Sequence, residues 1–283
     1  MELPVVVGVD GSDAAVGAVD WAADEAARTG QPLRLVFASL WEHYDRIKPN
    51  FSPDRASEEI LAERIVASAR EQAEALRPDV KVTAEVVPHD PVTALLTEAE
   101  QAYAVVVGNR GRGEITDLLL GSTSLTVAAR AQCPVVVVRG PRREPGDGRP
   151  RVVLGVGAED RSSAAGAFAF RQAARRGAVL EVVRAWRRPR IGSDDAGQES
   201  RHAQETLDDI VASFALGHAE VPVELTSVEG HPRKALLERA AGADLLVVGA
   251  RHRHSKVGLQ LGPVNHGVLH HSPCPVAVVP QPA

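Results

Sequence analysis

The chain carries the same succession of short, valine-rich segments twice, in the same order. Residues 5–9 recur as 152–156, and residues 133–138 recur as 274–279. Between them lie two further matches, 33–38 with 179–186 and 104–108 with 244–249. One match could arise by chance, but four matches in register indicate an internal duplication. The sequence therefore predicts two similar domains in one chain.

A stretch rich in proline and glycine separates the two copies. Residues 140–150 show no apolar period, which is typical of a linker. We therefore expect domain 1 to span residues 1–140, a linker to span 141–150 and domain 2 to span 151–283.

Within each copy, β-branched runs of strand length alternate with longer amphipathic stretches. In the first copy the strands are expected at 4–9, 33–38, 81–87, 104–108 and 134–139. Several runs are apolar on successive residues, as in parallel strands that are buried on both faces. Helices are expected from Ser12 as N-cap to Gly30 as stop signal, and at 57–76, 92–102 and 122–131. The alternation predicts an α/β fold with two tandem doubly wound domains, each a five-stranded parallel sheet flanked by helices.

Composition excludes several classes of protein. With 283 residues, 44% hydrophobic and 24% charged, the chain is neither disordered nor collagen-like. A net charge of −5 argues against nonspecific binding to nucleic acid. No run of about 18 apolar residues exists, and the N-terminus lacks the basic region of a signal peptide, so no membrane association is expected. With two cysteines, Cys133 and Cys274, a disulfide framework is not expected, and a cytoplasmic location is.

The loops that follow the first and fourth strands carry the chemistry, because doubly wound sheets bind ligands beyond the carboxyl ends of their strands. Glycines at 108, 111 and 113 follow the fourth strand, and Gly121 opens a helix. Such glycines let a ligand approach the backbone, and the amides of a helix N-terminus favour an anion. Ser122 and Ser124 add hydroxyl donors. The pattern indicates a phosphate cradle in two pieces, and the alternative is a glycine-rich surface turn beside an ordinary helix cap.

Asp10 stands at the end of the first strand, next to this predicted cradle. Its carboxylate is suited to accept hydrogen bonds from ribose hydroxyls. The alternative role is structural, because Asp-Gly is a common turn dipeptide. The polar segment 42–56, with two prolines, is a candidate lid over the site or a plain loop.

Other nucleotide motifs do not fit the chain. A P-loop is absent because no Gly-Lys-Ser or Gly-Lys-Thr occurs. Gly155 and Gly157 begin a dinucleotide fingerprint that lacks its third glycine, since position 160 is Asp160. Residues 10–13 faintly resemble the phosphate loop of ATP pyrophosphatases but lack its serine-glycine-glycine opening.

The spacing of the glycines, 108-x2-111-x9-121 followed by Ser122, resembles the nucleotide-binding signature of the universal stress protein family. The resemblance covers both halves, from the opening valine run with Asp10 to the closing Cys-Pro and valine run. It implies a tandem universal stress protein that binds ATP, with or without Mg²⁺. By resemblance, Asp10 contacts the nucleoside and the backbone near Ala38 borders adenine. Around ribose and phosphates the resemblance places Gly108, Gly111, Gly113, Gly121, Ser122 and Ser124.

The second copy departs from this pattern at the expected contacts. By strand alignment, Gly157 replaces Asp10, Pro263 replaces Ser122 and Asn265 replaces Ser124. Arg251, His252, Arg253 and His254 replace the glycine turn. We expect domain 2 to keep the fold with a degenerate nucleotide site. No metal site is expected there, since His270 and His271 are adjacent and diverge by about 100° on a helix. Two interpretations of the substituted loop stay open: a cationic loop that binds another anion or an acidic partner, and a loop that is simply solvated.

The leading hypothesis is a nucleotide-binding regulatory protein of the stress response, because no acid–base pair or activated nucleophile stands near the cradle. The alternatives are an ATP-hydrolysing enzyme of the pyrophosphatase type and a scaffold that binds no nucleotide. An unknown protein partner is expected. The two halves are expected to pair as an internal pseudo-dimer, and a homodimer of chains stays open.

Overall fold

The computed structural model describes residues 2–39, 53–111, 120–139, 148–157, 164–187, 195–251 and 261–281. It divides into two compact units, Met1–Arg142 and Arg143–Ala283, each with one copy of the repeated sequence. Most of the predicted linker, residues 140–147, lies outside the described residues. No helix in the described ranges is both long and apolar enough to cross a membrane.

Domain 1 is a five-stranded parallel sheet. Its strands are β1 (Val5–Gly8), β2 (Leu33–Ala38), β3 (Val82–Val87), β4 (Ala104–Gly108) and β5 (Val135–Val138). They lie in the order β3-β2-β1-β4-β5, and β1 pairs in parallel with β2 on one side and β4 on the other. The strand order therefore reverses between β1 and β4, which is where such sheets open a crevice for a ligand.

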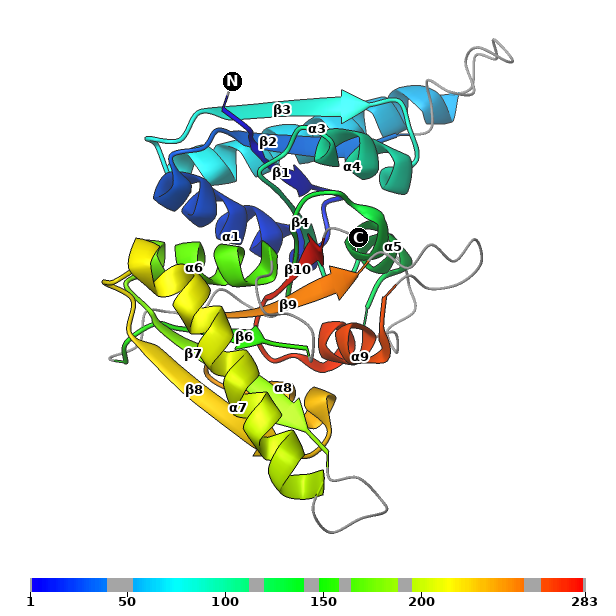
Figure 1. Ribbon diagram of the computed structural model, residues 1–283. Coiled ribbons are helices and arrows are strands. Elements are labelled where there is room, and N and C mark those ends of the chain that lie inside the picture. Colours follow the sequence, from blue (N-terminus) through cyan, green and yellow to red (C-terminus); the bar gives the residue numbers. More distant parts are fainter. Residues whose placement is uncertain are drawn as a thin grey trace. The chain divides into compact units, whose positions relative to one another are not determined.

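Two helix pairs cover this sheet (Figure 1). α1 (Asp13–Thr29) packs against α3 (Pro53–Leu76), and α4 (Pro91–Ala99) packs against α5 (Ser122–Arg130). The valines of β1 at positions 5–7 are fully buried, because helices lie over both faces of the strand.

Domain 2 repeats this architecture. Its sheet has the order β8-β7-β6-β9-β10, with β6 between β7 and β9. The strands are β6 (Arg151–Gly155), β7 (Val179–Trp186), β8 (Val223–Glu229), β9 (Leu245–Arg251) and β10 (Val276–Gln281). The helices are α6 (Ala164–Arg176), α7 (Asp195–Phe214) with the 3-10 turn Ala215–Gly217, α8 (Pro232–Ala240) and α9 (Pro263–His271). The predicted α/β fold, with two doubly wound five-stranded domains, is confirmed.

The predicted caps of α1 are also confirmed. The Ser12 hydroxyl accepts a hydrogen bond from the Ala15 amide at 3.2 Å, and Gly30 ends the helix with a φ of 68°. One boundary is wrong: α3 begins at Pro53 rather than at 57, so residues 53–56 do not belong to a loop. Proline suits the first turn of a helix because that position needs no N–H donor. The rest of the candidate lid, up to residue 52, lies outside the described residues.

Candidate functional site

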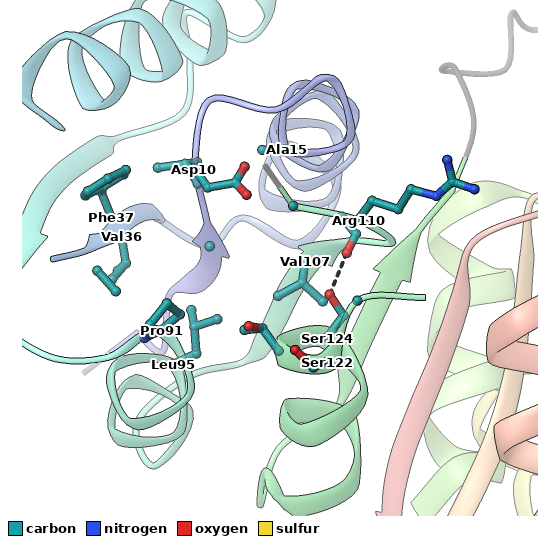
Figure 2. A pocket seen from close by; sticks show the side chains of 17 residues that line it. Asp10, Ala15, Val36, Phe37, Pro91, Leu95, Val107, Arg110, Ser122 and Ser124 are labelled. Carbon is teal, nitrogen blue, oxygen red and sulfur yellow. Dashed lines mark hydrogen bonds between the residues drawn. The ribbon is translucent and has the colours of Figure 1, made fainter. Parts of the chain in front are cut away.

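A pocket of about 430 Å³ opens at the carboxyl ends of β1, β2 and β4 in domain 1 (Figure 2). Its walls come from the loop after β1, the end of β2, the first turn of α4, the turn after β4 and the first turn of α5. It therefore lies at the reversal of strand order, and its volume is within the range of small-molecule sites, about 300–1,000 Å³.

The structure brings the predicted site residues together. Those that line this one pocket are Asp10, Ala38, Gly108, Gly111, Gly121, Ser122 and Ser124. Gly113 lies outside the described residues. Segments up to 114 residues apart in the sequence, from position 10 to position 124, thus meet around a single cavity.

Asp10 forms part of a turn and also lines the pocket. Its Oδ1 accepts hydrogen bonds from the Ser12 amide at 3.0 Å and the Ser12 hydroxyl at 2.6 Å, across a turn in which Gly11 has a φ of 78°. The same carboxylate lies beside the pocket (Figure 2). The turn therefore holds the carboxylate in a fixed orientation beside the cavity, which lowers the entropy cost of binding a ligand there.

Two of the glycines are required by close packing within the protein. A methyl group at Gly108 would lie 2.7 Å from the backbone carbonyl of Ala14 in α1. A methyl group at Gly111 would lie 2.7 Å from Oδ2 of Asp10. Gly108 is thus needed for α1 to approach β4, which is a structural reason that the sequence did not show.

Gly121 differs from these two because its surroundings are open. Its φ of −70° suits any residue, and the nearest atom to an added methyl group would be the Asn109 carbonyl oxygen at 3.7 Å. The Gly121 amide donates to that oxygen at 2.8 Å, which joins the turn after β4 to the start of α5. The fold itself would therefore tolerate a larger residue at position 121.

The N-terminus of α5 points its amides toward the pocket without a side-chain cap. The first helical bond runs from the Leu125 amide to the Gly121 carbonyl at 3.0 Å, so the amides of residues 122–124 precede it. Within the described residues no side chain caps this helix. Uncapped amides with the helix dipole behind them favour an anionic group.

The Ser124 hydroxyl makes a contact within the protein that the sequence did not indicate. It is buried and donates to the Gly108 carbonyl at 2.7 Å, the bond drawn in Figure 2. Because a hydroxyl has one hydrogen, this bond uses its donor, and it clamps the end of β4 to the start of α5. Its predicted contact with a ligand stays a prediction. In domain 2, Asn265 makes the same clamp through Nδ2 to the Gly249 carbonyl at 2.8 Å.

An apolar wall faces the polar side of the pocket, and the sequence analysis did not identify it. It consists of Val36 and Phe37 at the end of β2, Pro91 and Leu95 in α4, and Val107 in β4. This wall flanks Ala38, so the predicted adenine side of the pocket is apolar. The ends of β2 and α4 were identifiable from the sequence, but apolar residues there resemble ordinary core residues.

Two arginines lie at or next to the turn after β4, and Figure 2 shows the Arg110 side chain extending away from the cavity. Arg110 lines the pocket. The residues just before Arg110 and Arg139 are joined by a hydrogen bond from the Asn109 amide to the Val138 carbonyl at 2.9 Å, so the two arginines are neighbours. Burial, together with the charge of Arg110, lowers the pKa of Arg139. Among the described lining residues, Asp10 and Arg110 are the ionisable ones.

The corresponding positions of domain 2 differ in chemistry. Gly155 pairs with Val183 as Gly8 pairs with Val36, so Arg184 stands where domain 1 has Phe37. Gly157 stands in place of Asp10, and Pro263 removes an amide from the first turn of α9. Residues 252–260, which include His252 and His254, lie outside the described residues.

Comparison with known proteins identifies the family. The model of the Universal stress protein family matches residues 2–139 and again residues 148–280. Universal stress protein Rv2005c of Mycobacterium tuberculosis is 33% identical over 292 residues, which cover 98% of this chain and 97% of its own length.

The fold is shared with a solved structure. A universal stress protein from Archaeoglobus fulgidus covers 98% of this chain and 98% of its own at a TM-score of 0.70 and 20% identity, which shows the same fold. Another, solved in complex with cAMP, is 32% identical, covers 48% of this chain and 96% of its own, and has a TM-score of 0.38. With a match to the family model in each of its two domains, the chain belongs to the universal stress protein family.

Proposed function

We propose that domain 1 binds ATP in the pocket between β1 and β4, and that the protein acts as a nucleotide-dependent regulator in the stress response. Adenine would lie against Phe37 and Ala38, and Asp10 would accept hydrogen bonds from the ribose. The phosphates would face Gly111, Gly121 and the amides of residues 122–124.

The observation that carries the proposal is the division of one cavity into an apolar slot and an anion-binding end. Val36, Phe37 and Leu95 offer the flat apolar surface that a purine needs, and the uncapped start of α5 offers amides to a phosphate. Gly121 supports this division, since the open space beside it is not required by packing within the protein. A Mg²⁺ ion would be held chiefly by the phosphates and water, with Asp10 as the carboxylate among the described lining residues.

We further propose that the protein is a binding protein rather than an enzyme with rapid turnover. In this proposal Asp10 is occupied by Ser12 through Oδ1 and by the ribose, which places it at the nucleoside rather than beside the phosphates where a general base would be needed. In this proposal the protein acts in the cytoplasm, where its buried thiols Cys133 and Cys274 stay reduced, and bound ATP alters its contact with a protein partner.

The test uses the full chain after removal of any bound nucleotide, with calorimetric titration of ATP, ADP, AMP and cAMP. We expect one ATP per chain and weaker binding of AMP, which lacks the phosphates at the start of α5. The proposal is wrong if ATP does not bind, or if two molecules bind with equal affinity. Product analysis tests the second part: release of AMP and pyrophosphate at about 1 s⁻¹ or faster would identify an enzyme instead.

A further inference from the structure

Two histidines on helix α9 of domain 2 lie side by side. His266 and His270 are four residues apart, and their rings stack with centroids 4.3 Å apart. Both side chains are half-buried and line a cavity of about 610 Å³. From the sequence, metal binding was considered for the adjacent residues His270 and His271, which diverge on the helix. The pair that shares a helix face, His266 and His270, was not considered.

We propose that His266 and His270 form a bidentate site for a divalent transition-metal ion such as Zn²⁺, Ni²⁺ or Cu²⁺. Neutral imidazole is a preferred ligand of these ions, and two histidines at i and i+4 on one helix face are a known zinc-binding arrangement. With metal–nitrogen bonds of about 2.0–2.1 Å, tetrahedral coordination needs the two ligating nitrogens about 3.3 Å apart. The ring centroids are 4.3 Å apart and the planes are inclined by 29°, so both rings would turn about their side-chain bonds to direct one nitrogen each at the ion.

The position of the pair on the helix favours a cation. His270 is in the last turn of α9, where exposed carbonyl groups carry partial negative charge. Among the described residues no cluster of three or more histidine, cysteine or carboxylate ligands occurs. Water would therefore complete the coordination, and the site would be open, as in zinc sites that keep exchangeable positions.

One neighbour opposes the metal. Arg233 of α8 lines the same cavity, and its aliphatic stem lies over Gly267, where an added methyl group would collide with it. Its guanidinium group repels a bound cation, so we expect the affinity of the site for metal to be moderate. Removing this charge should strengthen metal binding.

The test is a titration of the tag-free full chain, stripped with a chelator, with Zn²⁺, Ni²⁺ and Cu²⁺ in separate calorimetric runs. We expect one ion per chain. His266→Gln and His270→Gln should each weaken binding by about tenfold or more, because each removes half of a chelate. His202→Gln, which changes a half-exposed histidine of α7 that does not line this cavity, is the matched control and should change the affinity less than about twofold. Arg233→Gln should raise it.

Circular dichroism of each variant checks that α9 is intact, and the visible spectrum of the Cu²⁺ complex reports imidazole coordination directly. The proposal is overturned if the wild-type chain shows no saturable binding up to about 1 mM ion. A Kd of that size corresponds to a binding free energy of about −4 kcal/mol, which is weak. It is equally overturned if His202→Gln weakens binding as much as His270→Gln does.

Discussion

Replacement of Gly121 by alanine should weaken nucleotide binding strongly and leave the fold intact. An added methyl group would lie 3.7 Å from the Asn109 oxygen and 3.8 Å from Cα of Arg110, which is ordinary van der Waals contact. The φ of −70° causes no strain in alanine. Alanine is a poorer N-cap than glycine, which destabilises the helix. It also reduces the conformational entropy of the unfolded chain, which stabilises the folded protein by about 0.4–1 kcal/mol. These effects nearly cancel, so the free energy of unfolding should change by less than about 1 kcal/mol.

The effect on binding should be much larger. The same methyl group would lie against the turn of residues 109–111, at 3.7–3.9 Å, and would take up room that the proposed phosphate needs to reach the amides there. Loss of one charge-assisted hydrogen bond costs about 1.5–3 kcal/mol, which corresponds to roughly 10- to 150-fold weaker ATP binding. Calorimetric titration with ATP measures the affinity, and thermal unfolding without nucleotide should show a Tm within about 4 °C of the wild type.

Domain 2 offers a matched control for this variant. Gly262 is the N-cap of α9, has a φ of −64° and has no atom within 4 Å of an added methyl group. Gly262→Ala should therefore have the same small effect on Tm and no effect on ATP affinity. If Gly121→Ala binds ATP as the wild type does, the start of α5 is not the phosphate site. If instead its Tm falls sharply while Gly262→Ala is unaffected, the packing argument is wrong.

Changes at three further site positions, and labelling of one buried thiol outside the site, provide the remaining tests. Asp10→Asn should keep the turn but weaken ATP binding about 10- to 100-fold in calorimetry, and an unchanged affinity would remove Asp10 from the ligand contacts. Gly108→Ala should lower the free energy of unfolding by about 1–3 kcal/mol in urea, since its methyl group would lie 2.7 Å from the Ala14 backbone. Ser124→Ala should lower both Tm and ATP affinity by releasing the clamp, whereas Ser124→Asn should retain Tm; equal losses in both would refute the clamp. Burial raises the pKa of Cys133 to about 11, so iodoacetamide at pH 8 should label this thiol after unfolding and not before, and rapid labelling of the native chain would contradict its burial.

The fold was predictable because the features that specify it are local and repeated. Runs such as residues 104–108, apolar at successive positions, occur at matching places in both copies, and helices with clear caps separate them. The pocket was predictable for a related reason: parallel strands place the residues after β1 and β4 at one edge of the sheet. Asp10 and Gly121 therefore line one cavity although 111 positions separate them in the sequence.

The individual roles of residues were less predictable because they depend on distances across the fold. Whether the Ser124 hydroxyl points to a ligand or to the Gly108 carbonyl is decided by how closely α5 approaches β4. In the same way, Gly108 occupies a position in the sequence that is typical of a ligand-binding glycine, but its packing partner is the backbone of α1. Phe37 and Leu95 could not be assigned to a pocket wall rather than to the core, since both locations favour the same residue types.

The duplicated domain separates changes that preserve the fold from changes that alter the site. Asn265 replaces Ser124, yet its amide makes the same bond to a strand-end carbonyl, so the clamp is maintained by a different residue. Gly155 is retained opposite Leu236 as Gly8 is opposite Leu95, because a methyl group at either would press on the leucine at 2.9–3.0 Å. In contrast, Gly157 and Arg184 keep the backbone path but remove the carboxylate and the apolar surface that domain 1 presents at Asp10 and Phe37.

The positions that changed chemistry are thus those where the side chain faces the cavity, and the positions that kept their contacts are those that join strands to helices. A domain that had only drifted would be expected to lose both kinds. The pattern supports a second domain kept for its fold, with one nucleotide bound per chain. Restoring aspartate through Gly157→Asp should not create a second ATP site, because Arg184 and Pro263 remain; two equivalents of ATP bound by that single variant would refute this account.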